Sequence, residues 1–237
     1  MALDPSRIQA ICFDVDGTLS DTDDLWTASL EKVIRPLRYL FPRRDAHAVA
    51  RWAIMAAESP ANALYHFLDH HGIDNTVANL ANWLSRIRPL ARPKHYWMIP
   101  RTREMLEAIC PHYPLAVISA RDAGATLGFL EHYSLIHFFK AIATALTCVH
   151  TKPFPDPVFW AAKELGVPSE NVLMIGDTVV DIRAGKAAGA QTVGVLCGFG
   201  EEEELRRAGA DLILPYPADV LPYLQRTNDL KQTEEAD

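Results

Sequence analysis

The apolar and polar residues of the chain follow three successive patterns. A short apolar run at residues 7–17, "RIQAICFDVDG", ends in a turn signal and is typical of a buried strand. From residue 24 to residue 92 the apolar positions recur at helical spacing, with prolines and one glycine as breaks. After residue 101, short apolar runs alternate with helix-like segments. The chain is therefore expected to contain an α/β part that is interrupted by an all-helical insert.

The alternating part predicts a parallel sheet that is covered by helices on both faces. Its expected strands are "LAVIS" at 115–119, "AIAT" at 141–144, "NVLMIG" at 171–176, "TVGVL" at 192–196 and "DLILP" at 211–215. Helices are expected over 102–110, 123–133, 156–166, 181–190, 202–209 and 218–226. The polar tail, 227–237, is expected to fray.

Composition narrows the class of protein. The chain has 237 residues, of which 49% are hydrophobic and 22% charged, enough to bury a sizeable core. A formal net charge of −7 argues against nucleic-acid binding, which needs clustered lysine and arginine. A compact anionic substrate remains possible, because positively charged groups could lie together at its binding site.

The cysteines and the N-terminal segment indicate the compartment. Cys12, Cys110, Cys148 and Cys197 are scattered and form no CxxC pair, which favours reduced thiols over a zinc site or a disulfide framework. The start of the chain, "MALDPSRIQA", has no charged-then-apolar signal, and no apolar run is long enough to span a bilayer. We expect a cytoplasmic protein that has no membrane partner.

Reactive side chains cluster at the ends of the predicted strands. Ligands of open parallel sheets bind at the carboxyl ends of the strands, so residues at those positions are candidates for chemistry. Four strand ends carry such groups or lie beside them, and the groups are Asp14 with Asp16, Ser119, Lys152, and Asp177 with Asp181.

The spacing of the aspartates predicts how they meet. Alternate strand residues point to the same face, so Asp14 and Asp16 should be neighbours at the strand tip, where Gly17 lets the backbone turn. Asp177 and Asp181 are four apart and should share a helical face if a helix starts by residue 178. Four crowded carboxylates would repel one another unless a cation lies among them. Oxygen ligands without matching histidine or cysteine favour Mg²⁺ over zinc.

A lysine and a hydroxyl complete a set of groups that suits phosphoryl transfer. A metal ion and the ammonium of Lys152 can neutralise phosphoryl oxygens, and the hydroxyl of Ser119 can orient them. One aspartate of the first pair can then attack phosphorus, while its neighbour acts as acid and base.

Four segments closely resemble the haloacid dehalogenase superfamily of phosphohydrolases, in that family's order. They are "FDVDGTLSDT", "VISAR", "TKPFPDPVFWAAKELGV" and "GDTVVDIRAGKAAGAQTVGV". The pattern is similar to the branch that contains phosphoglycolate phosphatase and β-phosphoglucomutase. The resemblance implies a Rossmann-like parallel-sheet core over residues 1–20 and 94–237, with an inserted α-helical cap domain over residues 21–93.

The resemblance also implies roles for the aspartates. Asp14 would attack phosphorus and form an aspartyl-phosphate, and Asp16 would protonate the leaving alcohol and then activate water. Mg²⁺ would be held by Asp14, by the backbone carbonyl of Asp16 and by Asp177, with Asp181 supporting the site. Family members that cleave carbon–halogen bonds lack an aspartate at the position of Asp16, so dehalogenase activity is disfavoured.

The remaining roles concern the phosphoryl group and the linker. Ser119, Ala120 and Lys152 would contact the phosphoryl group, and Lys152 would also restrain the nucleophile. One departure from the family pattern is Arg101, which stands where relatives commonly have glycine. This puts the local turn in question but touches no catalytic position.

Several functions are compatible with this set of residues. The first is a magnesium-dependent phosphatase that acts on a small phosphorylated metabolite. A phosphosugar mutase would use the same aspartyl-phosphate, and a receiver-type signalling module or a catalytically silent binding protein on the same fold are further alternatives. Phosphoglycolate, sugar phosphates, nucleotides and pyrophosphate all remain open as substrates, and the sequence does not indicate an oligomeric state.

Overall fold

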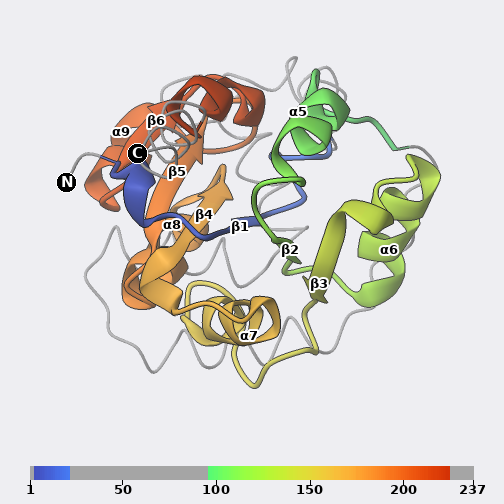
Figure 1. Cartoon of the computed structure of the whole chain (residues 1–237), viewed down its shortest axis with the longest axis horizontal. Helices are drawn as coiled ribbons and strands as arrows, with labels where there is room; N and C mark the ends of the chain where they lie inside the picture. Colours follow the sequence, from blue (N-terminus) through green and yellow to red (C-terminus); the bar gives the residue numbers. More distant parts are fainter. Residues whose placement is uncertain (1–2, 22–95, 225–237) are drawn as a thin grey trace, which may run out of the picture. The chain divides into compact units, whose positions relative to one another are not determined.

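One parallel sheet organises the part of the chain that the structure, a computed structural model, describes, namely residues 3–21 and 96–224. Its six strands lie in the order β3-β2-β1-β4-β5-β6, and every neighbouring pair is parallel (Figure 1). The strands are β1 (Ala10–Phe13), β2 (Leu115–Ile118), β3 (Phe139–Ala143), β4 (Val172–Gly176), β5 (Gln191–Val195) and β6 (Leu212–Leu214). The predicted α/β fold with a parallel sheet is confirmed, and all six expected strands form.

Helices connect the strands. They are α5 (Thr102–Ile109), α6 (Ala123–His132), α7 (Asp156–Leu165), α8 (Val179–Ala187) and α9 (Glu202–Arg207). Short 3-10 helices cover Pro5–Arg7, Ile136–Phe138, Ser169–Asn171 and Pro217–Val220. The helix expected over 218–226 begins differently, because Pro217–Val220 is a 3-10 turn and α-helical residues follow only at 221–224. Among the described residues, no helix has both the length and the apolar character needed to cross a membrane.

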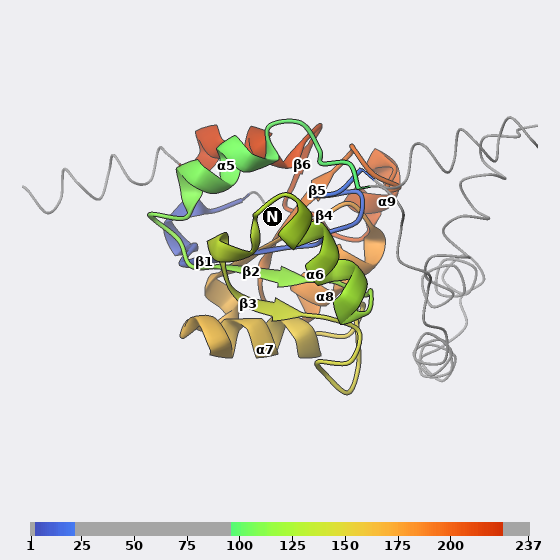
Figure 2. The same cartoon turned by 90° about the vertical axis from the view of Figure 1, so that its right-hand side faces the viewer.

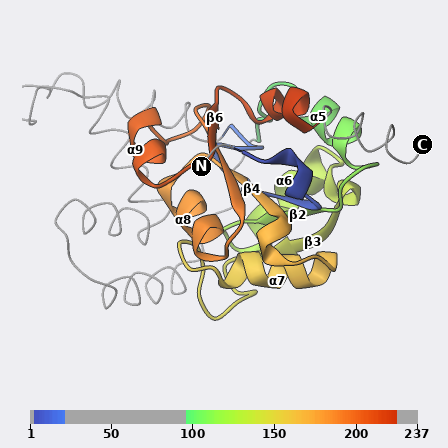
Figure 3. The ribbon, with the colours of Figure 1, turned by 60° about the vertical axis from the view of Figure 1, so that its left-hand side comes forward.

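The two faces of the sheet pack differently. Along β1, Ile11 and Phe13 join a cluster of large side chains with α5 and α6, whereas Ala10 and Cys12 join a second cluster with α7 and α8. The second cluster is rich in alanine, which lets α7 and α8 approach the sheet closely. Figures 2 and 3 show α5 on one side of the strands and α7 on the other. Each fully buried large side chain contributes about 1.5–3 kcal/mol to stability, so this layered core stabilises the sheet.

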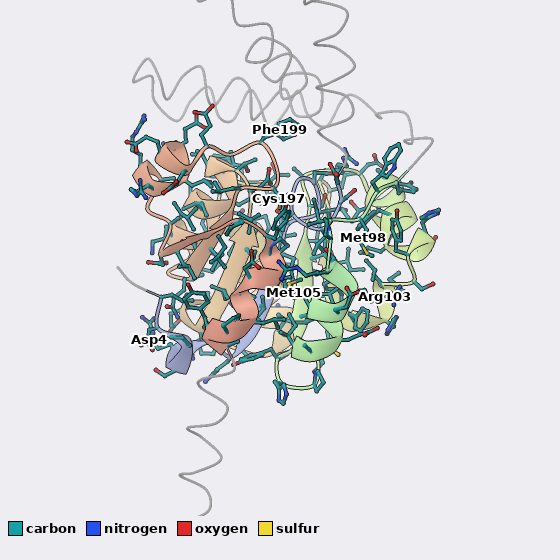
Figure 4. The ribbon with its side chains drawn as sticks, turned by 90° about the horizontal axis from the view of Figure 1, so that it is seen from above. Asp4, Met98, Arg103, Met105, Cys197 and Phe199 are labelled. Atoms are coloured by element: carbon teal, nitrogen blue, oxygen red, sulfur yellow. The ribbon has the colours of Figure 1, made fainter. Side chains whose placement is uncertain are left out.

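The strand register places the candidate residues at one edge. Phe13 of β1 pairs with Ile175 of β4, so the residues that follow these two central strands emerge together. The N–H of Asp14 extends this pairing by donating to the carbonyl of Ile175 at 2.9 Å. Figure 4 shows Cys197 and Phe199, which follow β5, at the opposite end of the core from Asp4, which precedes β1. The carboxyl ends of the strands therefore share an edge.

The turn before α5 forms although Arg101 stands at the position where relatives commonly have glycine. This residue takes the left-handed conformation, with φ 64° and ψ 11°, that glycine adopts without strain. Its guanidinium lies 2.5 Å from Oδ1 of Asp219, just after the 3-10 turn begins. The turn is thus kept, and an ion pair holds it against the C-terminal segment.

Two predictions lie outside the described residues. The helical insert of residues 21–93 falls there apart from its first residue, as does the tail of residues 227–237. The domain boundaries at residues 20, 21, 93 and 94 stay predictions.

Candidate active site

The turn after β1 carries the first two aspartates. β1 ends at Phe13, so Asp14 and Asp16 both lie beyond the strand, and strand alternation does not place their side chains as predicted. The N–H groups of Leu19 and Ser20 both donate to the carbonyl of Val15 at 2.8 Å, which closes a tight turn. Gly17 takes a positive φ of 73° within it, as the predicted turn requires.

A single ammonium group, that of Lys152, links Asp14, which follows β1, to Asp181 in the first turn of α8. Nζ of Lys152 donates to Oδ1 of Asp14 and, at 2.6 Å, to Oδ1 of Asp181. All three side chains are buried. Lys152 lies in the loop between β3 and α7. Its contact with Asp14 is consistent with the predicted restraint of Asp14 by this lysine.

Asp177 and Asp181 meet by a route that differs from the prediction. α8 begins at Val179, so Asp177 precedes the helix, and the two residues do not share a helical face. Instead, Thr178 caps the helix, and Asp181 folds back so that its Oδ2 accepts from the N–H of Thr178 at 3.0 Å and from its hydroxyl at 2.5 Å. This reciprocal cap also explains why α8 starts two residues before the predicted 181.

The Asp177 carboxylate is held from two other loops. Its Oδ2 accepts the N–H of Phe199 at 2.8 Å, and its Oδ1 accepts the hydroxyl of Thr18 at 3.4 Å. Thr18 therefore contacts a candidate metal ligand. The glycines on either side of Phe199 permit the approach, because a Cβ on Gly198 would lie 2.2 Å from Oδ2 of Asp177, and one on Gly200 would lie 1.8 Å from the Asp177 carbonyl oxygen.

Burial gives the site unusual electrostatics. The pKa of Asp14 is raised to about 7. Burial is the largest cause, the ammonium of Lys152 lowers the value, and the charges of Asp181 and Asp16 raise it. Burial, with Asp181 and Asp14, also raises the pKa of Asp177 well above its ordinary value. For Lys152 burial alone would lower the pKa, but the two carboxylates it contacts raise it above the ordinary value. The cluster thus favours additional positive charge.

The donor set fits a hard divalent cation. Within the described residues, Asp14, Asp177 and Asp181 each offer one carboxylate oxygen, and these oxygens lie within 4.8 Å of one another. Carboxylate oxygens are the ligands that Mg²⁺ prefers. Both oxygens of Asp181 already accept bonds from Lys152 and Thr178, which suits a residue that supports such a site rather than one that dominates it.

Asp16 stands apart from this buried cluster. Its side chain is 19% exposed, and its Oδ2 lies 2.8 Å from Nε of Arg121. Asp16 is not part of the group of three carboxylates whose oxygens lie within 4.8 Å of one another. Its expected contribution to a metal site through the backbone carbonyl stays a prediction.

Ser119 and Ala120 follow the neighbouring strand β2. Ser119 is buried, and its N–H donates to the carbonyl of Ala143 at the end of β3 at 2.9 Å. Its hydroxyl accepts the N–H of Arg121 at 3.1 Å, and Ala120 between them is half-buried. Their contact with a phosphoryl group stays a prediction, although both lie after a strand that pairs directly with β1.

Sequence reasoning missed four contributors, namely Arg121, Thr178, Gly198 and Gly200. Arg121 is the last residue of the "VISAR" segment. A charged residue so soon after an apolar strand could have indicated a functional role. Thr178 and Asp181 match the T-x-x-D pattern of a capping box. Gly198 and Gly200 follow β5 as "CGFG", and glycines at a strand end signal close backbone approach.

Carboxylates and a lysine at the carboxyl edge of a parallel sheet are typical of α/β enzymes. The haloacid dehalogenase-like hydrolase model matches residues 11–195, and the chain belongs to this family.

Curated relatives match along nearly the whole chain. The pyrophosphatase PpaX of Anoxybacillus flavithermus is 28% identical over 223 residues, which cover 94% of this chain and 99% of that protein. A phosphoglycolate phosphatase of Escherichia coli O157:H7 is 24% identical, with 92% of each chain covered. Among solved structures, a HAD family hydrolase of Deinococcus radiodurans R1 with bound phosphate and sodium has a TM-score of 0.66 at 22% identity, covering 94% of this chain and 97% of that one. The structural likeness shows the fold.

Proposed function

We propose that the protein is a magnesium-dependent phosphohydrolase that cleaves a small phosphomonoester through a phosphorylated Asp14. The observation that carries the proposal is the contact of one buried ammonium, Lys152, with both Asp14 and Asp181. This contact holds the Asp14 carboxylate in one orientation and supplies positive charge beside it, as an attacking carboxylate needs.

In the first step, an oxygen of the Asp14 carboxylate attacks phosphorus and the bond from phosphorus to the ester oxygen breaks. The leaving oxygen takes the electron pair of that bond and a proton from the carboxyl group of Asp16. The products are an alcohol and an acyl-phosphate on Asp14. Lys152 stabilises negative charge on the transferring group throughout.

In the second step, water attacks the phosphorus of the acyl-phosphate. Asp16, now a carboxylate, takes a proton from that water, and the bond from phosphorus to the Asp14 oxygen breaks. Inorganic phosphate leaves, and Asp14 returns to a carboxylate. Both steps balance with one ester and one water consumed for each alcohol and phosphate formed.

The residues that would hold Mg²⁺ are Asp14, Asp177 and the backbone carbonyl of Asp16, with Asp181 supporting them. When bound, the ion would neutralise phosphoryl oxygens and lower the repulsion between them and the carboxylates. Ser119 and the backbone N–H of Ala120 would bind the remaining phosphoryl oxygens.

The relatives support the reaction class. Proteins named pyrophosphatase and phosphoglycolate phosphatase match more than nine-tenths of this chain. The second name denotes hydrolysis of a phosphomonoester and the first hydrolysis of a phosphoanhydride, so both denote hydrolytic cleavage of a bond to phosphorus in a small molecule. A net charge of −7 also fits a small substrate better than a nucleic acid.

The proposal is tested by phosphate release from p-nitrophenyl phosphate and a panel of phosphorylated metabolites, with and without Mg²⁺. We expect release by the native protein that needs Mg²⁺ and that Asp14→Asn abolishes. Asp122→Asn is the matched control, because Asp122 only caps α6 by accepting the N–H of Ala125 at 3.1 Å. Release by Asp14→Asn at the native rate would contradict the proposal, and conversion of a hexose 1-phosphate into its 6-phosphate would favour a mutase instead.

A further inference from the structure

Arg121 and Asp16 form an ion pair at the rim of the buried cluster. Nε of Arg121 lies 2.8 Å from Oδ2 of Asp16, and the two side chains are only 14% and 19% exposed. Partial burial makes such a pair stronger than one on the open surface, where screening leaves little net attraction. The pair joins two different strands, because Asp16 follows β1 and Arg121 follows β2.

The backbone of Arg121 is fixed on both sides. Its N–H donates to the hydroxyl of Ser119 at 3.1 Å, and its carbonyl accepts the N–H of Ala145 at 2.8 Å. Directly after it, Asp122 caps α6. The guanidinium therefore extends from a backbone tied to the ends of β2 and β3.

The backbone of Asp16 is fixed as well. The N–H of Gly17 donates to the carbonyl of Ser20 at 2.9 Å, which closes the turn that carries Asp16. That turn sets the position of the Asp16 backbone but leaves its side-chain torsions to be decided by contacts. Arg121 supplies a contact that selects one orientation of the carboxylate.

We infer that Arg121 is a positioning residue that orients the Asp16 carboxylate for proton transfer to the leaving group and from water. The inference rests on the proposed function, in which Asp16 carries that proton. Proton transfer requires the donor and acceptor atoms to lie within about 2.6–3.2 Å, so a carboxylate that samples several rotamers would transfer its proton less often. Each ordered rotamer also removes an entropic cost from the reaction.

Leaving groups differ in their need for a proton from Asp16. p-Nitrophenolate leaves as a stable anion without a proton, whereas an alkyl alkoxide needs one. The value of kcat/KM reports the steps up to departure of the leaving group. Loss of an Asp16 orienting contact should therefore lower kcat/KM for an alkyl phosphate and spare it for p-nitrophenyl phosphate.

The experiment compares Arg121→Ala and Arg121→Lys with the native protein on both esters, the alkyl ester being the best one in the metabolite panel. We expect Arg121→Ala to lose at least about tenfold more kcat/KM on the alkyl ester than on p-nitrophenyl phosphate, and Arg121→Lys to recover part of it. Arg206→Ala, which removes an exposed arginine of α9 whose side chain is 62% exposed, is the control and should change neither value.

A double variant isolates the mechanism. If Arg121 acts through Asp16, adding Arg121→Ala to Asp16→Asn should cost little more than Asp16→Asn alone, because residues that act as a unit are not additive. Two results would overturn the inference and indicate a phosphate-binding or purely structural role for Arg121. One is an equal loss of kcat/KM on both esters in Arg121→Ala, and the other is full additivity of the effects of Arg121→Ala and Asp16→Asn. Thermal unfolding of each variant separates misfolding from these outcomes. If the native protein hydrolyses neither ester, the proposed function itself fails, and that result is distinct from either pattern in the variants.

Discussion

The ammonium of Lys152 lies 2.6 Å from Oδ1 of Asp181, although 29 residues separate the two in the chain. The same ammonium contacts Asp14, which precedes it by 138 residues. The segments that carry Asp14, Lys152 and Asp181 are therefore joined through one positive charge. All three side chains are buried, so water cannot replace a charged partner that is lost.

Replacing that lysine should damage both stability and activity. Lys152→Met leaves the carboxylates of Asp14 and Asp181 facing each other without a cation, which we expect to cost about 3 kcal/mol of unfolding free energy. Activity should fall by roughly 100-fold or more, because the stabilising charge beside the phosphoryl group is lost. Urea unfolding and the phosphate-release assay measure the two effects.

Lys163→Met is the matched control, because Lys163 is exposed on α7. It should behave like the native protein in both assays. Native activity in Lys152→Met would contradict the assigned role.

The loop after β5 should tolerate no side chain at its first glycine. In Gly198→Ala the new Cβ would lie 2.2 Å from Oδ2 of Asp177 and 2.7 Å from Cα of Gly17. Asp177 or the loop must move, and we expect Mg²⁺ affinity to fall by roughly tenfold or more. Calorimetric titration with Mg²⁺ measures the change.

Gly166→Ala controls for backbone strain. Gly166 has a positive φ of 75° at the end of α7, and a Cβ there would meet nothing within 4 Å. This variant should lose about 1 kcal/mol of stability and keep its Mg²⁺ affinity. Equal Mg²⁺ affinities in the two variants would show that the Gly198 contact does not shape the Asp177 carboxylate.

Substitutions of Arg101 should separate strain from ion pairing. Arg101→Ala keeps the left-handed backbone and loses the partly exposed pair with Asp219, a loss of less than about 1 kcal/mol. Arg101→Gly loses the same pair but relieves backbone strain worth about 1 kcal/mol. The glycine variant should therefore unfold at a higher temperature than the alanine variant, and the reverse order would argue against strain in this turn.

Magnesium binding should depend on pH in a defined direction. Burial raises the pKa of Asp14 from 3.8 in the unfolded chain to about 7 in the folded one. Metal-free folded protein therefore binds more protons than unfolded protein between these values, so this group makes stability fall as pH rises from about 4 to about 7. Mg²⁺ needs the ionised carboxylates of Asp14 and of Asp177, whose pKa is also raised, so its affinity should rise with pH through about 7.

Calorimetric titrations at about pH 6 and about pH 8, each in two buffers of different ionisation enthalpy, count the protons released on binding. We expect proton release at the lower pH and less at the higher one, where Asp14 is already ionised. Proton-independent binding at both would contradict a raised Asp14 pKa.

The sequence predicted the sheet better than the contacts within the site. Apolar runs marked all six strands. The four central strands, β1, β2, β4 and β5, are buried along their whole length, and strands buried on both faces read as continuous apolar segments. The four candidate aspartates and Lys152 were found because each follows or lies close to a strand end. The helical spacing of Asp177 and Asp181 gave the wrong reason for their proximity, since a capping box at Thr178 decides where α8 begins. The partner of Asp16 was missed, because Arg121 is distant in sequence and pairs with it only after β1 and β2 align.

The most direct test of the account is detection of the phosphorylated Asp14. Protein mixed with Mg²⁺ and p-nitrophenyl phosphate would be quenched in acid within milliseconds, digested and analysed by mass spectrometry. The account predicts one added phosphoryl group on the peptide that contains Asp14, removed by hydroxylamine as an acyl-phosphate and accumulating further in Asp16→Asn, which lacks the base for the second step. Turnover without any phosphorylated peptide, or with the phosphoryl group on another residue, would contradict it.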